Sequence, residues 1–334
     1  MFMSGAYSHL GRRKGDYMFN RHKRFLLPIL VISVIAIVFI YKQFEEEKPE
    51  VVVVLKNVDL DYWKYIKAGA EKGFEDLGID GKVVAPKDET VEAQREMLKR
   101  VLKENPDVLI VAPVYSADSI NSELEKFVKK DIPVLFIYAD DTWEHKTAYI
   151  GTNNFSLGEK AGILLASQLQ PGDKVALLGG KQRLVEGERI RGAKDSLEAV
   201  KIEIVAEKKG LPDDNPKVVT EEIESILREH PDLKGVVAST DYIALPVLKA
   251  LQEKGIQMPV IGASGIPEML KLVEEGTLSS AVAQNPYDMG YISVQTALKV
   301  TKGEQVSHFL DSDVDIITKG NAKERIDFLN SVME

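Results

Sequence analysis

Residues 51–78, VVVVLKNVDLDYWKYIKAGAEKGFEDLG, form the stretch that decides the fold. Four consecutive valines are typical of a strand that is buried on both faces. After a polar turn, apolar residues recur in steps of three and four, which predicts an amphipathic helix. These helix positions are Trp63, Ile66, Ala70, Phe74 and Leu77. A buried strand followed by such a helix indicates the first unit of a parallel α/β sheet.

The turn at residues 56–63 is expected at the carboxyl end of that first strand. Open α/β sheets bind ligands beyond the carboxyl ends of their strands. We therefore predict that this turn forms one wall of a small-molecule cleft.

The composition excludes several classes of protein. The 334 residues are enough for two domains, and 44% hydrophobic with 28% charged residues is ordinary for a globular protein. The absence of cysteine excludes disulfides, thiolate metal sites, thiol catalysis and cysteine-linked lipid anchors. Beyond residue 44 the chain has 36 basic and 51 acidic residues, and so acidic a chain disfavours nucleic acid as a partner.

Residues 25–44 are predicted to be a transmembrane signal anchor. The segment 25–41, FLLPILVISVIAIVFIY, contains no charged residue and has about the minimum length of a spanning helix. Basic residues precede it, and Glu45, Glu46 and Glu47 follow it. The positive-inside rule then places residues 1–24 in the cytoplasm and, after a linker at 45–50, the rest of the chain outside the cell membrane.

Two alternatives remain open at this end of the chain. A cleavable signal peptide also begins with basic residues and an apolar core, although no small-residue cleavage site follows here. In addition, Lys14-Gly15-Asp16 can be encoded by a purine-rich ribosome-binding sequence just upstream of Met18. On that hypothesis translation starts at Met18 and residues 1–17 are no part of the protein.

Beyond the linker, predicted strands alternate with predicted helices. Strands are expected at residues 51–54, 82–85, 108–112, 133–138, 174–178, 203–206, 235–238, 259–262 and 280–283. Helices are expected at residues 63–77, 90–103, 118–130, 156–168, 188–199, 217–228, 243–254, 267–275 and 287–301. After residue 301 we expect an irregular end, apart from one alternating strand near residues 311–315.

Two sequence repeats indicate two similar lobes. Residues 104–108, ENPDV, match residues 229–233, EHPDL, and residues 132–135, IPVL, match residues 258–261, MPVI. Each pair brackets the same order of helix end, strand, helix and strand. If the lobes are equivalent, their strand ends line one shared cleft. These predicted strand ends are Val114-Tyr115 with Ser239-Thr240, and Tyr138-Ala139 with Ser264-Gly265.

A series of short motifs follows in order along the same region. They are D-x-x-Y-W and K-A-G-A (residues 59–70), I-P-V (132–134), Y-I-G-T-N-N (149–154), G-E-R-I-R-G (187–192), S-T-D (239–241), V-I-G (260–262), G-T-L (276–278) and A-Q (283–284). In this order and spacing, over some 280 residues, the chain resembles the type I periplasmic solute-binding proteins, nearest to the ribose- and galactose-binding group. Lactose-repressor-type ligand-binding cores share this fold.

The resemblance implies an α/β fold of two similar lobes, each a parallel sheet flanked by helices. The N-terminal lobe would comprise residues 51–152 and 285–312, and the C-terminal lobe residues 153–284 and 313–334. Three hinge segments, near residues 152–154, 284–286 and 311–313, would let the lobes close over a ligand.

The resemblance also implies ligand contacts, position by position. Tyr62 and Trp63 match paired aromatic residues that stack on a sugar ring, with simple core packing as the alternative. Arg189 matches an arginine whose planar donors hold the ring oxygen and hydroxyls, with an ion pair to Glu186 as the alternative. Tyr65 is expected to be structural or solvent-facing.

Further contacts are implied on the other lobe and at the hinge. Thr240 and Asp241 fall on an Asn-Asp pair of the family, and Gln284 falls on a hinge glutamine that bonds a hydroxyl.

The sequence departs from the sugar-binding pattern at three places. Leu60 stands where an asparagine is expected, and Ser264 where an aspartate is expected. Tyr138-Ala139 replaces an Asp-Arg pair, with Asp140 close behind. Because the family's aspartates accept bonds from sugar hydroxyls, their loss weakens an assignment to ribose. A deoxy, larger or partly apolar ligand is favoured instead, with Tyr115 and Tyr138 as added contact surface.

No catalytic or metal site is predicted. Residues 178–181, LGGK, lack the spacing of a phosphate loop, and residues 262–265, GASG, are no nucleophile elbow. The loop from residue 311 lacks the glycine and glutamate of a calcium loop, and the five histidines are scattered. We therefore expect no enzymatic activity, no metal and no cofactor.

The expected function is that of a membrane-anchored extracytoplasmic binding protein for a sugar-like ligand. Its bound state would be presented to an ABC-type transporter permease or to a membrane sensor kinase, and an uncleaved anchor slightly favours sensing. A lactose-repressor-type regulator is the disfavoured alternative, because a membrane segment occupies the place of a helix-turn-helix.

Overall fold

The computed structural model describes residues 48–56, 58–140, 143–181 and 183–333. Residues Pro49–Glu334 form one compact unit, whose fold is given below. The predicted anchor at residues 25–44 and the basic segment before it lie outside the described residues. Within the described part of the chain, no helix is both long enough and apolar enough to cross a membrane.

One of the two halves of this unit, which draws on both ends of its sequence, is built on a six-stranded parallel sheet. Its strands, in spatial order, are β12 (Phe309–Asp311), β5 (Ala148–Gly151), β4 (Val134–Ile137), β3 (Val108–Val111), β1 (Glu50–Val54) and β2 (Asp80–Val84). The four valines of β1 are fully buried between β3 and β2. The prediction of a strand buried on both faces is therefore confirmed.

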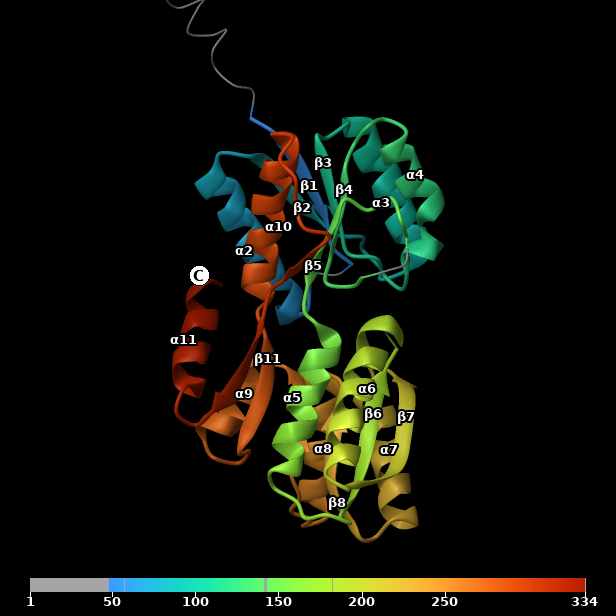
Figure 1. The fold of residues 1–334 in the computed structure, drawn as a ribbon, viewed down its shortest axis with the longest axis vertical. Helices are drawn as coiled ribbons and strands as arrows, with labels where there is room; N and C mark the ends of the chain where they lie inside the picture. Colours follow the sequence, from blue (N-terminus) through green and yellow to red (C-terminus); the bar gives the residue numbers. More distant parts are fainter. Residues whose placement is uncertain (1–47, 57, 141–142, 182, 334) are drawn as a thin grey trace, which may run out of the picture. The chain divides into compact units, whose positions relative to one another are not determined.

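Helices cover both faces of this sheet (Figure 1). On one face, α2 (Asp61–Leu77) and α10 (Pro286–Thr301) pack with Val51 and Val53. On the other, α3 (Val91–Glu104) and α4 (Asn121–Val128), the latter preceded by a 3-10 turn, pack with Val52 and Val54. We call this sheet with its four helices the N-lobe.

The other half of this unit has a four-stranded parallel sheet and an adjoining three-stranded sheet. The first has the order β7 (Glu203–Leu211), β6 (Lys174–Gly180), β8 (Leu233–Ala238) and β9 (Val260–Ile261). The second has the order β10 (Ala263–Ser264), β11 (Ser280–Gln284) and β13 (Val314–Thr318), with β13 antiparallel. Six helices cover them: α5 (Asn154–Ala166), α6 (Arg183–Ala199), α7 (Pro216–Glu229), α8 (Asp241–Glu253), α9 (Pro267–Glu274) and α11 (Ala322–Ser331). We call this half the C-lobe.

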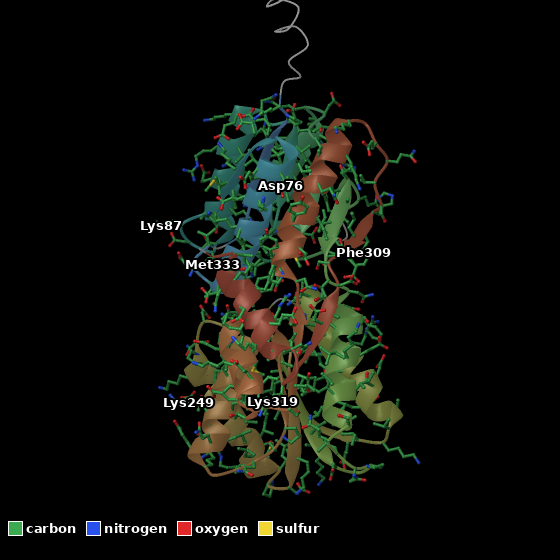
Figure 2. The ribbon with its side chains drawn as sticks, turned by 90° about the vertical axis from the view of Figure 1, so that its left-hand side faces the viewer. Asp76, Lys87, Lys249, Phe309, Lys319 and Met333 are labelled. Carbon is green, nitrogen blue, oxygen red and sulfur yellow. The ribbon has the colours of Figure 1, made fainter. Side chains whose placement is uncertain are left out.

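The expectation of a largely irregular carboxyl end is wrong. Residues 309–331 contain β12, β13 and the helix α11, which packs against α9. Figure 2 shows Lys319 and Met333 near the two ends of α11, with Met333 nearer to the N-lobe. Because only Ala322 and Leu329 of α11 are buried, its sequence carries little amphipathic signal.

Both lobes contain one close helix pair of the same design. In the N-lobe, a Cβ on Gly69 of α2 would lie 1.9 Å from the Tyr287 carbonyl oxygen of α10. In the same pair, a Cβ on Gly290 would lie 2.1 Å from the Ile66 oxygen.

The helices α5 and α6 of the C-lobe repeat this contact. A Cβ on Gly158 would lie 2.0 Å from the Arg189 oxygen, and one on Gly192 would lie 2.1 Å from the Phe155 oxygen. In all four cases the oxygen belongs to the residue three positions before the partner glycine. This shared geometry supports the two-lobe interpretation of the sequence repeats.

The chain passes between the lobes three times, and the three segments are joined by polar contacts. It leaves β5 for α5 at Thr152, leaves β11 for α10 at Asn285, and leaves β12 for β13 at Ser312. The Thr152 hydroxyl lies 3.4 Å from the Ser312 hydroxyl and donates to Gln284 Oε1 at 3.3 Å. These side chains are almost completely buried.

A buried carboxylate fixes the turn between β10 and α9. Asp241 Oδ2 accepts hydrogen bonds from the backbone amides of Gly265 and Ile266, at 2.6 and 2.9 Å. A Cβ on Gly262 would lie 2.3 Å from Asp241 Oδ1, so the glycine makes room for the carboxylate. Burial raises the pKa of Asp241 to about 6, although these amides oppose the shift.

We predict that Gly69→Ala destabilises the protein by about 1–3 kcal/mol or more, because its methyl group overlaps a helix backbone. Gly187→Ala is the matched control, since Gly187 lies in α6 with nothing within 4 Å of its Cβ position. The control is expected to be neutral or to stabilise by about 0.5–1 kcal/mol. Urea unfolding measures both changes, and equal effects of the two variants would contradict this account of helix packing.

We also predict a pH-dependent contribution of Asp241 to stability. Below its ordinary pKa of 3.8 the carboxyl group is protonated in both the folded and unfolded states. As the pH rises towards about 6, the unfolded state releases its proton before the folded state does, so stability falls and then levels off. The free energy of unfolding of the wild type, minus that of Asp241→Asn, should fall by roughly 2 kcal/mol between about pH 4 and about pH 7. A difference that stays constant with pH would contradict the raised pKa.

Candidate functional site

A cavity of about 200 Å³ lies between the two lobes, at the carboxyl ends of their strands. The N-lobe contributes the residues that follow β1, β2, β3 and β4, and the C-lobe those at or after the ends of β6, β7, β8, β10 and β11. The lining residues are Lys56, Leu60, Tyr62, Trp63, Glu89, Val114, Tyr115, Tyr138, Lys181, Asp213, Asp214, Thr240, Tyr242, Ser264 and Gln284. The turn that follows the four valines is therefore one wall of a cleft.

Three buried aromatic rings form the N-lobe wall of this cavity. Tyr62 and Trp63 come from the first turn of α2, and Tyr138 follows β4. The ring centroids of Trp63 and Tyr138 lie 4.8 Å apart, and each lies 5.6 Å from that of Tyr62. All three contacts are edge-to-face, an arrangement that aromatic quadrupoles favour. The wall is thus rigid and largely apolar.

Tyr138 has a backbone conformation that is rare for a residue with a side chain. Its φ is 74°, and the Ala139 amide donates to the Ile137 carbonyl oxygen at 2.9 Å across it. This bond closes a strained γ-turn, which turns the chain sharply at the end of β4. This turn places the Tyr138 ring among the aromatic residues of the wall. Backbone strain of this kind is common at ligand sites.

Lys56 places a positive charge beside these rings. Its Nζ lies 5.3 Å from the ring centroid of Trp63 and 5.5 Å from that of Tyr138, within the range of cation–π attraction. The same ammonium lies 3.0 Å from Glu89 Oε1 on the loop after β2. Only 9% of Lys56 is exposed, so the charge is held within the cavity wall.

The C-lobe wall is more polar. Asp213, on the loop after β7, accepts a hydrogen bond from the Thr240 hydroxyl at 2.7 Å. Burial raises the pKa of Asp213, while the Thr240 bond and the positive charges of Lys56 and Arg189 oppose that rise. Its neighbour Asp214 is exposed and lies 3.6 Å from Lys181 Nζ.

Gln284 joins the cavity to the segments that cross between the lobes. Its Oε1 accepts hydrogen bonds from the Tyr62 hydroxyl at 3.0 Å and from Thr152 at 3.3 Å. Its backbone oxygen accepts a bond from Arg325 of α11 at 2.7 Å. Hydrogen bonds through Gln284 therefore link the aromatic wall to the crossing segments.

Arg189 is buried beneath the cavity rather than exposed in it. Its Nε donates to Asn154 Oδ1 at 2.9 Å, and its Nη1 donates to the carbonyl oxygens of Ser239 and Ala263 at 2.9 and 3.1 Å. Its Nη2 is buried and has no hydrogen-bond partner among the described residues. The guanidinium thus ties together the start of α5, the end of β8 and β10, while Nη2 has no partner in the described part of the chain.

The structure brings together seven of the ten predicted ligand contacts. Tyr62, Trp63, Tyr115, Tyr138, Thr240, Ser264 and Gln284 line the cavity. Arg189, Asp140 and Asp241 do not. Asp140 is exposed and lies 3.1 Å from Lys146. Asp241 is fully buried, with its Oδ1 lacking a partner among the described residues. Tyr65 is buried and packs within the core cluster of the C-lobe.

Several polar residues of the cavity were not among the ligand contacts predicted from the sequence. The clearest are Lys56, Glu89, Lys181, Asp213 and Asp214. Each is a charged residue in a turn, a position that normally indicates a solvated surface. The only signal available was their place after a predicted strand, which holds most clearly for Lys56.

Comparison with known proteins agrees with this architecture. The chain matches the family model described as periplasmic binding protein domain over residues 51–305. The ribose import binding protein RbsB of Escherichia coli K12 is 27% identical over 275 residues, which cover 81% of this chain and 91% of the relative. The D-allose-binding periplasmic protein of the same bacterium is 25% identical over 273 residues, which cover 77% and 86%.

A solved structure is similar over the same region. GanP, a glucose-galactose binding protein from Geobacillus stearothermophilus, superposes with a TM-score of 0.75 at 25% identity, covering 83% of this chain and 99% of its own. The resemblance read from the sequence motifs is confirmed. The chain belongs to the type I periplasmic binding protein family.

Proposed function

We propose that this protein binds a small sugar or sugar-like molecule in the cavity between its lobes and closes over it. The bound state is then presented to a membrane partner, either an ABC-type transporter permease or a sensor kinase. The observation that carries the proposal is the cavity itself, where an aromatic wall faces a wall of carboxylate, hydroxyl and amide groups. A sugar ring has this same character, with C–H groups on its faces and hydroxyls at its edge.

The size of the cavity supports a ligand of one ring. Its volume of about 200 Å³ is below the range of roughly 300–1,000 Å³ that is usual for drug-sized ligands. The names of the relatives also support this class of ligand, since they bind ribose, allose, and glucose or galactose.

The choice between transport and sensing depends on the membrane partner. A relative named for ribose import favours delivery to a transporter. The segment at residues 25–44 favours a protein held permanently at the membrane, which suits either role. On this proposal the ligand-binding lobes lie outside the cell membrane and act at the start of an uptake or signalling step.

We predict that the full chain, purified in a non-ionic detergent, is stabilised by at least one of D-ribose, D-allose, D-galactose, D-glucose and D-arabinose. A ligand at a hundred times its dissociation constant stabilises a protein by about 2.7 kcal/mol, which thermal unfolding detects readily. Trp63→Ala should weaken that binding by at least about tenfold in calorimetry, which is about 1.4 kcal/mol.

Trp143→Ala is the matched control for this experiment. Trp143 is also a buried tryptophan, but it packs on Phe136 and does not line the cavity. It should lower the melting temperature and leave the affinity within about threefold of the wild type. Equal losses of affinity in the two variants would place the ligand elsewhere.

We further predict that the protein remains in the membrane fraction after an alkaline carbonate wash. Replacing residues 25–44 with a cleavable signal peptide should release it as a soluble protein that still binds its ligand. If the protein with its own residues 25–44 is instead recovered in the soluble fraction and has lost its amino end, the uncleaved anchor is contradicted.

A further inference from the structure

The N-lobe wall of the cavity is mainly aromatic, whereas the C-lobe wall carries two aspartate carboxylates, Asp213 and Asp214. In sugar-binding sites, ionised oxygens form strong hydrogen bonds with hydroxyl donors. The resemblance to sugar-binding proteins implies an aspartate carboxylate after β4 and another at the end of β10. The structure has Tyr138 and Ser264 at those places.

Neither of these two residues can serve as a substitute acceptor of that strength. The Tyr138 ring is packed edge-to-face against Tyr62 and Trp63. The Ser264 hydroxyl already accepts a bond from the Asp241 amide at 3.3 Å. A ligand that needs a charged acceptor must therefore find it on another loop.

Three carboxylates line the described cavity, and their surroundings separate them. Glu89 lies 3.0 Å from the ammonium of Lys56, within its own lobe. The side chain of Asp214 is 84% exposed and lies beside Lys181, at the rim. Asp213 is the more buried of the two neighbouring aspartates, and its Oδ1 is oriented by Thr240.

Burial raises the pKa of Asp213, and positive charges from both lobes favour its ionised form against that rise. Lys56 on the N-lobe and Arg189 on the C-lobe each lower its pKa against the effect of burial. Since one oxygen is bonded to Thr240, the other oxygen of this carboxylate can accept bonds from a ligand in the cavity.

We propose that Asp213 is the residue that recognises the ligand's hydroxyl groups, and that it replaces the carboxylates missing at positions 138 and 264. The ligand is then a neutral, ring-sized molecule that presents hydroxyls to the C-lobe and C–H groups to Tyr62, Trp63 and Tyr138. This inference rests on the proposed sugar-binding function and assigns its specificity to the loop after β7.

The test compares Asp213→Asn with Asp195→Asn in the full chain, purified in detergent; Asp195 is an exposed aspartate of α6 that does not line the cavity. The first substitution keeps the size of the side chain and an oxygen for Thr240, but it removes the charge. The second makes the same change on the surface of the same lobe, outside the cavity. Calorimetry with D-ribose, D-allose, D-galactose, D-glucose and D-arabinose gives the affinity of each variant, and thermal unfolding without sugar checks that each is folded.

Asp213→Asn is expected to bind the same sugars at least about thirtyfold more weakly, since hydrogen bonds to charged groups are among the strongest in proteins. Asp195→Asn is expected to stay within about threefold of the wild type. If Asp213→Asn binds as tightly as the wild type while Trp63→Ala does not, the role of Asp213 is overturned and the sugar-binding function stands. If the wild type binds none of the five sugars, the proposed function and this inference fail together.

Discussion

Parallel pairing of buried strands is the constraint on which the rest of this molecule depends. A strand such as β1, apolar on both faces, is stable only where helices cover both sides of its sheet. Parallel neighbours then need helical crossovers, and all strands of one sheet end at the same edge. The two lobes bring such edges together, so residues at or just beyond the ends of nine strands line a single cavity. The binding site follows from the fold rather than from any one motif.

Gln284 connects the cavity wall to the segments that cross between the lobes. Its side chain bonds Tyr62 in the aromatic wall and Thr152 in a crossing segment, and its backbone oxygen bonds Arg325. Because Thr152 also lies against Ser312, one buried polar cluster joins all three crossings. A ligand that shifts Tyr62 would therefore act on the relative positions of the lobes, which is the kind of hinge motion that binding proteins of this family use.

The sequence predicts the layered α/β fold because hydrophobic periodicity carries that information. The valine run, the helix face from Trp63 to Leu77 and the two Pro-containing repeats each correspond to observed elements. The helix α11 was missed because just two of its residues are buried, which leaves too weak a periodic signal.

The candidate site was predicted less completely, for a related reason. Tyr62, Trp63 and Gln284 were found through their motifs, whereas Asp213 lies in an ordinary turn sequence, Pro212-Asp213-Asp214-Asn215. The strand β7 continues to Leu211 through polar residues that give no strand signal, and this extension carries Asp213 to the cavity. Contacts made across lobes leave no local pattern in the chain.

The central claim is that a sugar binds between the two lobes, against Trp63. The chain has two tryptophans. The tryptophan fluorescence of a Trp143→Phe variant therefore comes from Trp63 at the cavity, and that of a Trp63→Phe variant comes from Trp143 in the N-lobe core. Titration of both with D-ribose, D-allose, D-galactose, D-glucose and D-arabinose, followed by tryptophan fluorescence, tests the claim directly. The account predicts a saturable change in emission from Trp63 with at least one of these sugars and little change from Trp143. Saturable binding by calorimetry with no change in the emission of Trp63 would contradict it.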